Sequence, residues 1–432
     1  MKPARWVGVG AVLGAGAALA VAVAHGAGDE STYGQIRLFS EALSRVRANY
    51  VDPVKDEDLI KSAVQGMVSK LDPHSGYMDA KSFGGDFQSR TQGRFGGVGI
   101  QVAPDEGAIK VISPMDGMPA AAAGIKPGDR VTAINGTPVG KDFSASIDRM
   151  RGPVGTKVTL TVQRDGEKKP FEVTLVRADV PIDATTSRRE GNVAYIRMPG
   201  FNEKTAQGLE KAVRDLKKQI GPALQGYVLD LRNNPGGLLD QAIQVSDDFL
   251  TSGEVVSTRG RQADDTQRYD AKPGDITDGK PIVVLINAGS ASASEIVAGA
   301  LQDHKRATIL GMTSFGKGSV QTVIPLGDKR GALRLTTARY YTPSGHSIQA
   351  QGIVPDIQVA QGDESSMPRI LRPSEADLEG HLAGEPVSAK RAEAPLIQAA
   401  PGTKYDDFQL AYALDLLRGT MTVASVTKKQ AT

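Results

Sequence analysis

The sequence predicts a multidomain α/β protein, in which a helical N-terminal region and an inserted β-rich domain precede a core of alternating strands and helices. Three observations support this. The chain has 432 residues, which is too long for one ordinary domain. Its apolar pattern changes from helical spacing to short strands, and then to strand–helix alternation. Its composition, 40% apolar and 23% charged, is typical of globular proteins.

Residues 1–28 are predicted to form a signal peptide or a membrane anchor. Lys2 and Arg5 precede an uncharged apolar run over residues 6–24, and small residues follow it. The run is nearly long enough to span a bilayer, so anchoring is an alternative to cleavage. In either case we expect the protein to be exported to the periplasm, free or anchored to the inner membrane.

Residues 29–94 are predicted to form a helical region. Apolar residues recur at helical spacing between residues 33 and 71, and Pro53 separates two groups of them. The segment Leu-Asp-Pro-His-Ser at 71–75 closes this region. Because no second histidine lies nearby, we interpret its Asp–His pair as a turn rather than a metal or catalytic site.

Residues 95–178 contain short strands separated by strong turn signals, among them the Asn-Gly pair at 135–136. This order resembles a PDZ domain. Its glycine-rich segment lies where such domains bind a peptide's terminal carboxylate, because consecutive free N–H groups form an anion-binding nest. The adjacent strand edge can then pair with an extended peptide. The predicted peptide-binding residues are Gly96, Gly97, Val98, Gly99 and Ile100.

Residues 179–360 are predicted to form an α/β layer whose functional groups lie in loops at strand ends. Strands are expected at 193–196, 227–231 and 281–286, helices at 203–218, 238–250 and 294–303, and a strand pair at 320–324 and 333–340. Residues 361–432 are charged and rich in proline and alanine, which indicates a polar tail with one short helix at 408–417.

Two segments of the core carry candidate catalytic groups. Residues 289–295 read Gly-Ser-Ala-Ser-Ala-Ser-Glu, and residues 315–318 read Phe-Gly-Lys-Gly. A serine attacks an acyl group only when a base removes its proton, and that base need not be histidine. The residues alone do not choose among Ser290, Ser292 and Ser294, and each of them could simply cap the following helix.

Several other chemistries find little support in the sequence. The chain has no cysteine, which excludes disulfides and thiol nucleophiles. No histidine pair has metal-ligand spacing, so we expect no metal and no organic cofactor. A net charge of +2 and few aromatic residues give no sign of nucleic-acid binding. His304 and His346 remain formal alternatives as bases in a Ser-His-Asp enzyme.

The two core motifs, together with Gln321 and residues 71–75, resemble those of the carboxyl-terminal processing (tail-specific) peptidases, over residues 38–356. The resemblance implies a crotonase/ClpP-like strand–helix protease core with an embedded PDZ domain, and serine–lysine endopeptidase activity. It assigns the nucleophile to Ser292, the base to Lys317 and an orienting role to Gln321. It also implies an oxyanion hole formed by Ala293 and either Gly236 or Gly237.

Lysine can act as a base near neutral pH only if its pKa falls by roughly 3 units from about 10.4. Burial lowers a lysine pKa, whereas an adjacent carboxylate raises it. We therefore expect Lys317 to be buried, and the uncharged amide of Gln321 suits a residue that holds the amine without favouring its charged form.

The resemblance implies protein substrates with free, apolar C-termini, and it leaves room for an activating adaptor or a homo-oligomer. Two other functions were considered. A non-catalytic PDZ scaffold is disfavoured because Ser292, Lys317 and Gln321 occur together. An acyl-CoA enzyme of the crotonase type is disfavoured by the signal sequence and the PDZ-like segment.

Overall fold

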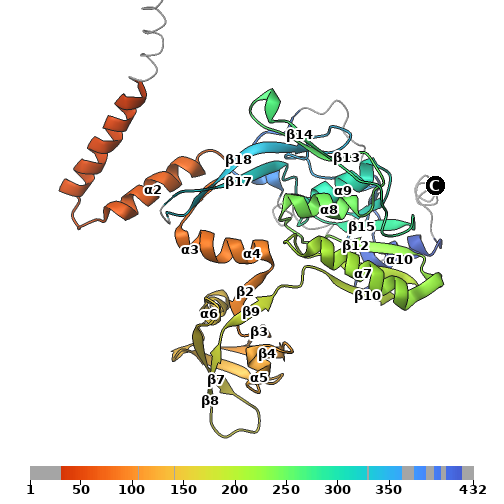
Figure 1. The fold of residues 1–432 in the computed structure, drawn as a ribbon, viewed down its shortest axis with the longest axis horizontal. Helices are drawn as coiled ribbons and strands as arrows, with labels where there is room; N and C mark the ends of the chain where they lie inside the picture. Colours follow the sequence, from red (N-terminus) through yellow and green to blue (C-terminus); the bar gives the residue numbers. More distant parts are fainter. Residues whose placement is uncertain are drawn as a thin grey trace, which may run out of the picture. The chain divides into compact units, whose positions relative to one another are not determined.

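The computed structural model describes residues 31–105, 107–140, 142–327, 330–361, 374–385, 394–399 and 405–420. The chain divides into two units, Met1–Lys70 and Leu71–Thr432 (Figure 1). The predicted signal or anchor at residues 1–28 lies outside the described ranges. Within those ranges, no helix has both the length and the apolar character that crossing a membrane requires.

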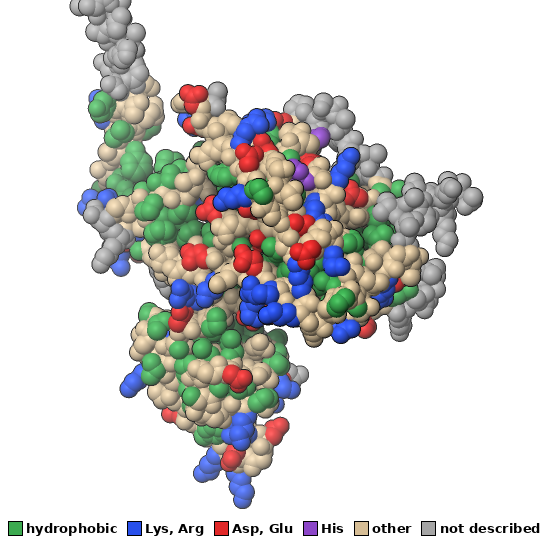
Figure 2. Space-filling model, turned by 45° about the vertical axis from the view of Figure 1, so that its right-hand side comes forward, with side chains coloured by type: hydrophobic (Ala, Val, Ile, Leu, Met, Phe, Trp, Pro, Cys, Tyr) green, Lys and Arg blue, Asp and Glu red, His purple; other side chains and the backbone are tan. Residues whose placement is uncertain are grey.

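The described part of the first unit is helical, as predicted. Residues 31–49 form one helix and α2 (Asp56–Ser69) forms a second, with Pro53 in the break between them. The first turn of α2 contains three acidic residues, Asp56, Glu57 and Asp58. Their negative charges interact favourably with the positive end of the helix dipole. Large apolar side chains, including Ile36, remain exposed on this unit (Figure 2).

The β-rich domain begins and ends in a two-stranded ribbon of β2 (Arg94–Gly97) and β9 (Ala178–Pro181). Its sheet has the order β3-β4-β5-β7-β8, which places β3 at an edge, and its buried side chains form a separate core. The elements are β3 (Ile100–Asp105), β4 (Ala108–Pro114), α5 (Pro119–Ala122), β5 (Arg130–Ile134), β6 (Thr137–Pro138), α6 (Phe143–Met150), β7 (Lys157–Gln163) and β8 (Phe171–Val176).

The core contains a six-stranded sheet in the order β10-β11-β12-β15-β16-β19, parallel except for β10 at its edge. The predicted strands and helices are confirmed within a few residues. The elements are β10 (Thr186–Glu190), β11 (Val193–Arg197), α7 (Thr205–Ile220), β12 (Gly226–Asp230), α8 (Leu239–Asp247), β15 (Ile282–Ile286), α9 (Ala293–Asp303), β16 (Thr308–Gly311) and β19 (Ile357–Gln358).

A second sheet has the order β1-β18-β13-β14, with β17 also paired to β18. Its strands are β1 (Gly76–Met78), β13 (Glu254–Arg259), β14 (Gln267–Asp270), β17 (Ser319–Pro325) and β18 (Ala332–Tyr341). Short helical segments α3 (Ala80–Ser82), η1 (Phe83–Phe87) and α4 (Gln88–Gln92) follow β1. Helices α7, α8 and α9 pack on one face of the parallel sheet, in one cluster with residues of β13 and β18.

The other face of the parallel sheet is covered by α10 (Phe408–Leu417), the helix predicted at those residues. Its N-terminal residue Asp407 accepts a hydrogen bond from Leu410 and pairs with Arg232 at 2.7 Å, so α10 is fastened to the loop after β12. Residues 361–432 were predicted to be a polar tail. In the structure, residues 374–385 also lie against the core, and Glu375 is fully buried.

Three neighbouring parallel strands, β12, β15 and β16, end at the same edge of the sheet. The loop after β12 carries the glycines at 236 and 237, the loop after β15 carries the serines, and the loop after β16 carries Lys317. Because the carboxyl ends of parallel strands meet at one edge, segments far apart in the sequence converge there.

Candidate active site

Ser292 has a strained backbone at the junction between the loop after β15 and helix α9. Its φ of 55° and ψ of −113° lie in a region that residues other than glycine rarely adopt. Such a conformation costs about 1–3 kcal/mol and persists only when surrounding contacts enforce it. A sharp strand-to-helix turn of this kind presents a serine hydroxyl at the top of a sheet.

The structure distinguishes the three candidate serines. Ser290 Oγ donates to the carbonyl of Leu231 at 2.8 Å, and Ser294 Oγ donates to that of Asn234 at 2.9 Å; both serines are fully buried. Ser292 is 8% exposed, and its side chain lies close enough to Tyr340 to influence the pKa of that hydroxyl. Ser290 and Ser294 therefore fix the loops, while Ser292 offers a hydroxyl that a substrate can reach.

Tyr340 joins the two predicted catalytic segments from β18. Its backbone N–H donates to the carbonyl of Gly318 at 2.8 Å, next to Lys317, and its hydroxyl lies near the side chain of Ser292. Burial raises the pKa of the Tyr340 hydroxyl, so it stays protonated at neutral pH. Sequence reasoning did not identify this residue, because a tyrosine in an apolar strand reads as part of the core.

The carboxylate of Glu295 connects the serine loop to the lysine loop. Its Oε2 accepts from the backbone N–H of Ser292 at 2.7 Å and from that of Lys317 at 2.9 Å. Its Oε1 accepts from Gly316 N–H and Ser314 Oγ, both at 2.6 Å. Burial raises the pKa of Glu295 to about 7, although these four donors act in the opposite direction.

Lys317 has the environment that a neutral lysine needs. Burial lowers its pKa, and the positive charge of Arg334 lowers it further, while the carboxylates of Glu375, Glu295 and Asp72 act to raise it. Within the described ranges, Lys317 Nζ forms no ion pair. By solvent accessibility Lys317 is only partly buried, so the expected burial of this amine holds in part, and the nearby carboxylates were not foreseen.

Each carboxylate near Lys317 is hydrogen-bonded to other groups. Asp72 accepts from the backbone N–H groups of His74 and Ser75 and from Ser75 Oγ, which confirms the predicted turn at residues 71–75. Glu375 accepts from Gln349 Nε2 at 2.9 Å and lies 2.8 Å from His74 Nε2. Although burial acts to raise them, these hydrogen bonds lower the pKa values of Asp72 and Glu375, so both carboxylates stay ionised. Burial of Lys317 and the charge of Arg334 outweigh their effect, and the pKa of Lys317 is lowered.

Gln321 points elsewhere than the resemblance implies. Its Nε2 donates to Ser319 Oγ at 2.9 Å and to Thr336 Oγ1 at 3.3 Å. Among the described residues, no hydrogen bond links it to Lys317. A register shift between Val320 and Gln321 accompanies this placement on β17. An orienting role for Gln321 thus stays a prediction.

The glycine loop after β12 packs against the backbone around Ser292. Gly236 N–H donates to Asn234 Oδ1 at 2.9 Å, whereas the N–H groups of Gly237 and Ala293 have no acceptor in the described part of the chain. Gly236 itself leaves no room for a side chain: a Cβ there would lie 2.9 Å from the Ser292 Cβ and 2.9 Å from the Ala293 nitrogen. The geometry therefore favours Gly237 over Gly236 as the donor.

Asn234 holds the glycine loop against the serine loop. Its carbonyl accepts from Ala291 N–H at 3.0 Å and from Ser294 Oγ, and its side chain donates to the carbonyl of Met198. Buried Asn234 thus fastens the loop after β12 to the loop after β15.

The predicted peptide-binding loop of the PDZ-like domain is well ordered by backbone contacts. Gly96 and Gly97 pair with β9, and the carbonyls of Val98 and Gly99 accept from Ala120 N–H at 3.0 Å and Met115 N–H at 2.9 Å. Ile100 then begins β3, and no described strand covers the outer edge of β3. An edge of this kind is open to strand addition.

The histidines considered as alternative bases have other partners. His304 Nε2 contacts the carbonyl of Glu254 at 2.7 Å, and His346 Nδ1 lies 2.8 Å from Ser344 Oγ. Across the described residues, no cluster of histidine, aspartate and glutamate could hold a metal ion.

Comparisons with known proteins match three regions of the chain. The model of peptidase family S41 matches residues 192–359, that of the PDZ domain residues 96–175, and that of the activating protease CtpB N-terminal domain residues 17–82. The PDZ domain predicted from the sequence is thereby confirmed.

Similar proteins cover most of the chain. A carboxy-terminal-processing protease of Bartonella bacilliformis is 51% identical over 400 residues, which are 92% of this chain and 91% of the relative. The carboxy-terminal processing protease CtpB of Bacillus subtilis is 37% identical, over 75% of this chain and 67% of the relative. A carboxyl-terminal-processing protease of Synechocystis is 34% identical, over 88% and 82%. The chain therefore belongs to the carboxy-terminal processing proteases of peptidase family S41, which makes it a serine-type peptidase.

Proposed function

We propose that this protein is an exported endopeptidase that cleaves peptide bonds with Ser292 as nucleophile and Lys317 as general base. The observation that carries the proposal is the bridge through Glu295. One buried carboxylate binds the backbone of both residues, so the strained serine and the desolvated lysine are held by a single group.

In the first step, Ser292 Oγ attacks the carbonyl carbon of the scissile bond, and neutral Lys317 accepts the hydroxyl proton. The resulting tetrahedral oxyanion is stabilised by the N–H groups of Gly237 and Ala293, the latter at the positive end of α9. The Lys317 ammonium then donates its proton to the departing amine, which leaves an ester on Ser292.

In the second step, water attacks this ester and Lys317, neutral again, takes a proton from the water. Collapse of the second oxyanion releases the new carboxyl terminus, and the proton returns from Lys317 to Ser292 Oγ. The cycle needs an amine that is neutral before each attack, and this is the state that burial of Lys317 favours.

Substrate recognition is assigned to the PDZ domain. A free, apolar C-terminal tail would add to the outer edge of β3, with its carboxylate at Gly97, Val98 and Gly99. Support comes from the edge position of β3 and from the constrained glycine loop beside it. The PDZ domain would then deliver the tail to Ser292.

Export to the periplasm and self-association complete the proposal. Export rests on the basic and apolar character of residues 1–28. The exposed apolar side chains of the N-terminal helices offer a surface for a second copy or for an activating adaptor.

Digestion of a protein with an apolar C-terminal tail tests the catalytic assignment. Wild type should cleave it, whereas Ser292→Ala, Lys317→Ala and Lys317→Arg should not, because a guanidinium cannot act as a base near neutral pH. Lys211→Ala, at an exposed position of α7, is the matched control and should cleave normally. Undiminished cleavage by Ser292→Ala would rule out the assignment.

A further inference from the structure

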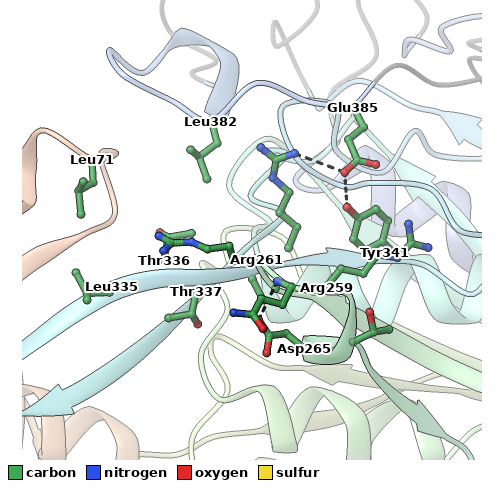
Figure 3. A pocket seen from close by; sticks show the side chains of 15 residues that line it. Leu71, Arg259, Arg261, Asp265, Leu335, Thr336, Thr337, Tyr341, Leu382 and Glu385 are labelled. Carbon is green, nitrogen blue, oxygen red and sulfur yellow. Dashed lines mark hydrogen bonds and ion pairs between the residues drawn. The ribbon is translucent and has the colours of Figure 1, made fainter. Parts of the chain in front are cut away.

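A cavity of about 860 Å³ lies along one edge of β18. Residues 335–339 of that strand line one side, and residues 259–262 at the end of β13 line another. Leu382 and Glu385, from the segment that packs on the core, form a further wall (Figure 3).

The cavity faces a gap in the sheet. Arg334 of β18 pairs with Gly76 on one side and Val323 on the other, and Arg339 pairs with Arg259 and with Ser319. Since β17 occupies one edge of β18, β1 and β13 must share the opposite edge. Between them, no described strand covers residues 335–338, where Ser75 Oγ accepts the N–H of Thr336 at 3.1 Å.

The gap adjoins the candidate active site. Thr336 lines the cavity and also accepts the hydrogen bond from Gln321. Leu71, another lining residue, directly precedes Asp72, whose charge acts on Lys317. A chain lying in the cavity would therefore run alongside the residues that surround the proposed base.

One wall of the cavity binds a carboxylate of the protein itself. Glu385 accepts a hydrogen bond from the Tyr341 hydroxyl and lies 3.5 Å from Arg339 (Figure 3). Arg259 stacks on the ring of Tyr341, 3.8 Å from its centroid. The wall thus combines guanidinium groups with a hydroxyl donor, a set that suits a carboxylate.

Two arginines at this end of the cavity have no carboxylate partner among the described residues. Arg259 and Arg261 line the cavity and form no ion pair with any residue in the described ranges. Asp265 also lines it, and its carboxylate accepts the backbone N–H of Gln262 at 3.0 Å. Within the described ranges, Arg259 and Arg261 therefore leave positive charge without a paired carboxylate at the β13 end of the gap.

We infer that this cavity is a substrate subsite, in which an extended peptide lies along residues 335–338 of β18 and places a carboxylate at Arg259 and Arg261. A gap of four residues accepts about 13 Å of extended chain. The carboxylate comes from an acidic side chain or from the substrate's own C-terminus. The inference rests on the proposed cleavage at Ser292.

Matched peptides test the subsite. A substrate peptide is prepared with Glu or Gln at each position flanking the scissile bond, and each version has a free or an amidated C-terminus. At one position wild type should cleave the Glu peptide about tenfold faster in kcat/KM than the Gln peptide. In an Arg259→Gln/Arg261→Gln variant this ratio should fall to about one. Arg268→Gln, on β14 outside the cavity, should keep it.

The amidated peptides separate the two sources of the carboxylate. If amidation lowers kcat/KM in wild type but not in the double variant, the substrate C-terminus binds in the cavity, and the subsite is supported. The subsite would be overturned if wild type cleaved the Glu and Gln peptides equally at every position and if amidation had the same effect in wild type and in the double variant. A preference for Glu that survives in the double variant would overturn it as well.

A binding measurement tests the subsite independently of the proposed cleavage at Ser292. If wild type cleaves none of the peptides, cleavage at Ser292 is refuted, but the Glu/Gln comparison can still be made by fluorescence anisotropy on Ser292→Ala protein. Tighter binding of the Glu peptide that depends on Arg259 and Arg261 supports the subsite; equal binding refutes it.

Discussion

Glu295 Oε2 lies 2.9 Å from the backbone nitrogen of Lys317, and the same oxygen lies 2.7 Å from the backbone nitrogen of Ser292. The first turn of α9 thus fixes two loops that follow different strands. This arrangement needs a side-chain oxygen that accepts two hydrogen bonds at once, and a carboxylate offers one at each of its two oxygens.

Glu295→Gln should lower kcat by roughly 10- to 100-fold, because at either end of the side chain the amide NH₂ would face at least one backbone N–H donor that the carboxylate now accepts. Peptide hydrolysis and a thermal melt measure this together. Glu210→Gln, at an exposed position of α7, is the control. Wild-type kcat in a folded Glu295→Gln protein would contradict the bridging role.

The pH dependence of activity should report the ionisation of Lys317. Attack requires the neutral amine, so kcat/KM should rise with pH through the depressed pKa of Lys317 and then level off. The charges around the amine predict opposite shifts. Arg334→Gln removes a cation that lowers this pKa and should move the rise to higher pH, while Glu375→Gln should move it to lower pH. Shifts of the same sign in both variants would contradict the electrostatic account.

Gly236→Ala should lower kcat by about 10²–10³, the loss expected when an oxyanion donor is displaced. The φ of Gly236 is +97°, and a Cβ would lie 2.8 Å from the carbonyl oxygen of Ala291, so the loop must shift away from Ser292. Steady-state kinetics on a peptide give the effect, with a thermal melt to confirm folding. Gly140→Ala, where a Cβ would meet no atom within 4 Å, is the control.

Asp407→Ala should reduce the free energy of unfolding by about 2–3 kcal/mol, because it removes both the N-cap of α10 and the partner of the buried Arg232. Urea unfolding measures the change, and Asp406→Ala is the control at the adjacent position. An equal effect in both variants would show that α10 is not anchored through Arg232.

The sequence predicted the strands and helices of the core because each carries an apolar run of the right period, as at residues 282–286 and 408–417. Glu295 was within reach of sequence reasoning too, since Ser292 followed three residues later by Glu295 is a capping-box pattern. The contact between Glu295 and Lys317 could not be predicted from the sequence, because β16 lies between the two residues in the chain.

Other parts of the site could not be predicted for similar reasons. Tyr340 meets Ser292 only because β18 packs against α9, and a strand pattern carries no such information. Glu375 lies in a charged segment that reads as a tail, yet its carboxylate is buried between His74 and Gln349. The side chain of Asn234 accepts from the N–H of Gly236, an orientation that the sequence alone does not indicate.

The most direct test of the account is covalent labelling with a fluorophosphonate, which reacts only with an activated serine. After proteolysis, mass spectrometry should locate the adduct on Ser292 in wild type. The labelling rate should rise with pH as Lys317 loses its proton, and Lys317→Met protein should remain unlabelled. An adduct on Ser290 or Ser294, or labelling of the Lys317→Met protein at the wild-type rate, would contradict the assignment of Ser292 and Lys317.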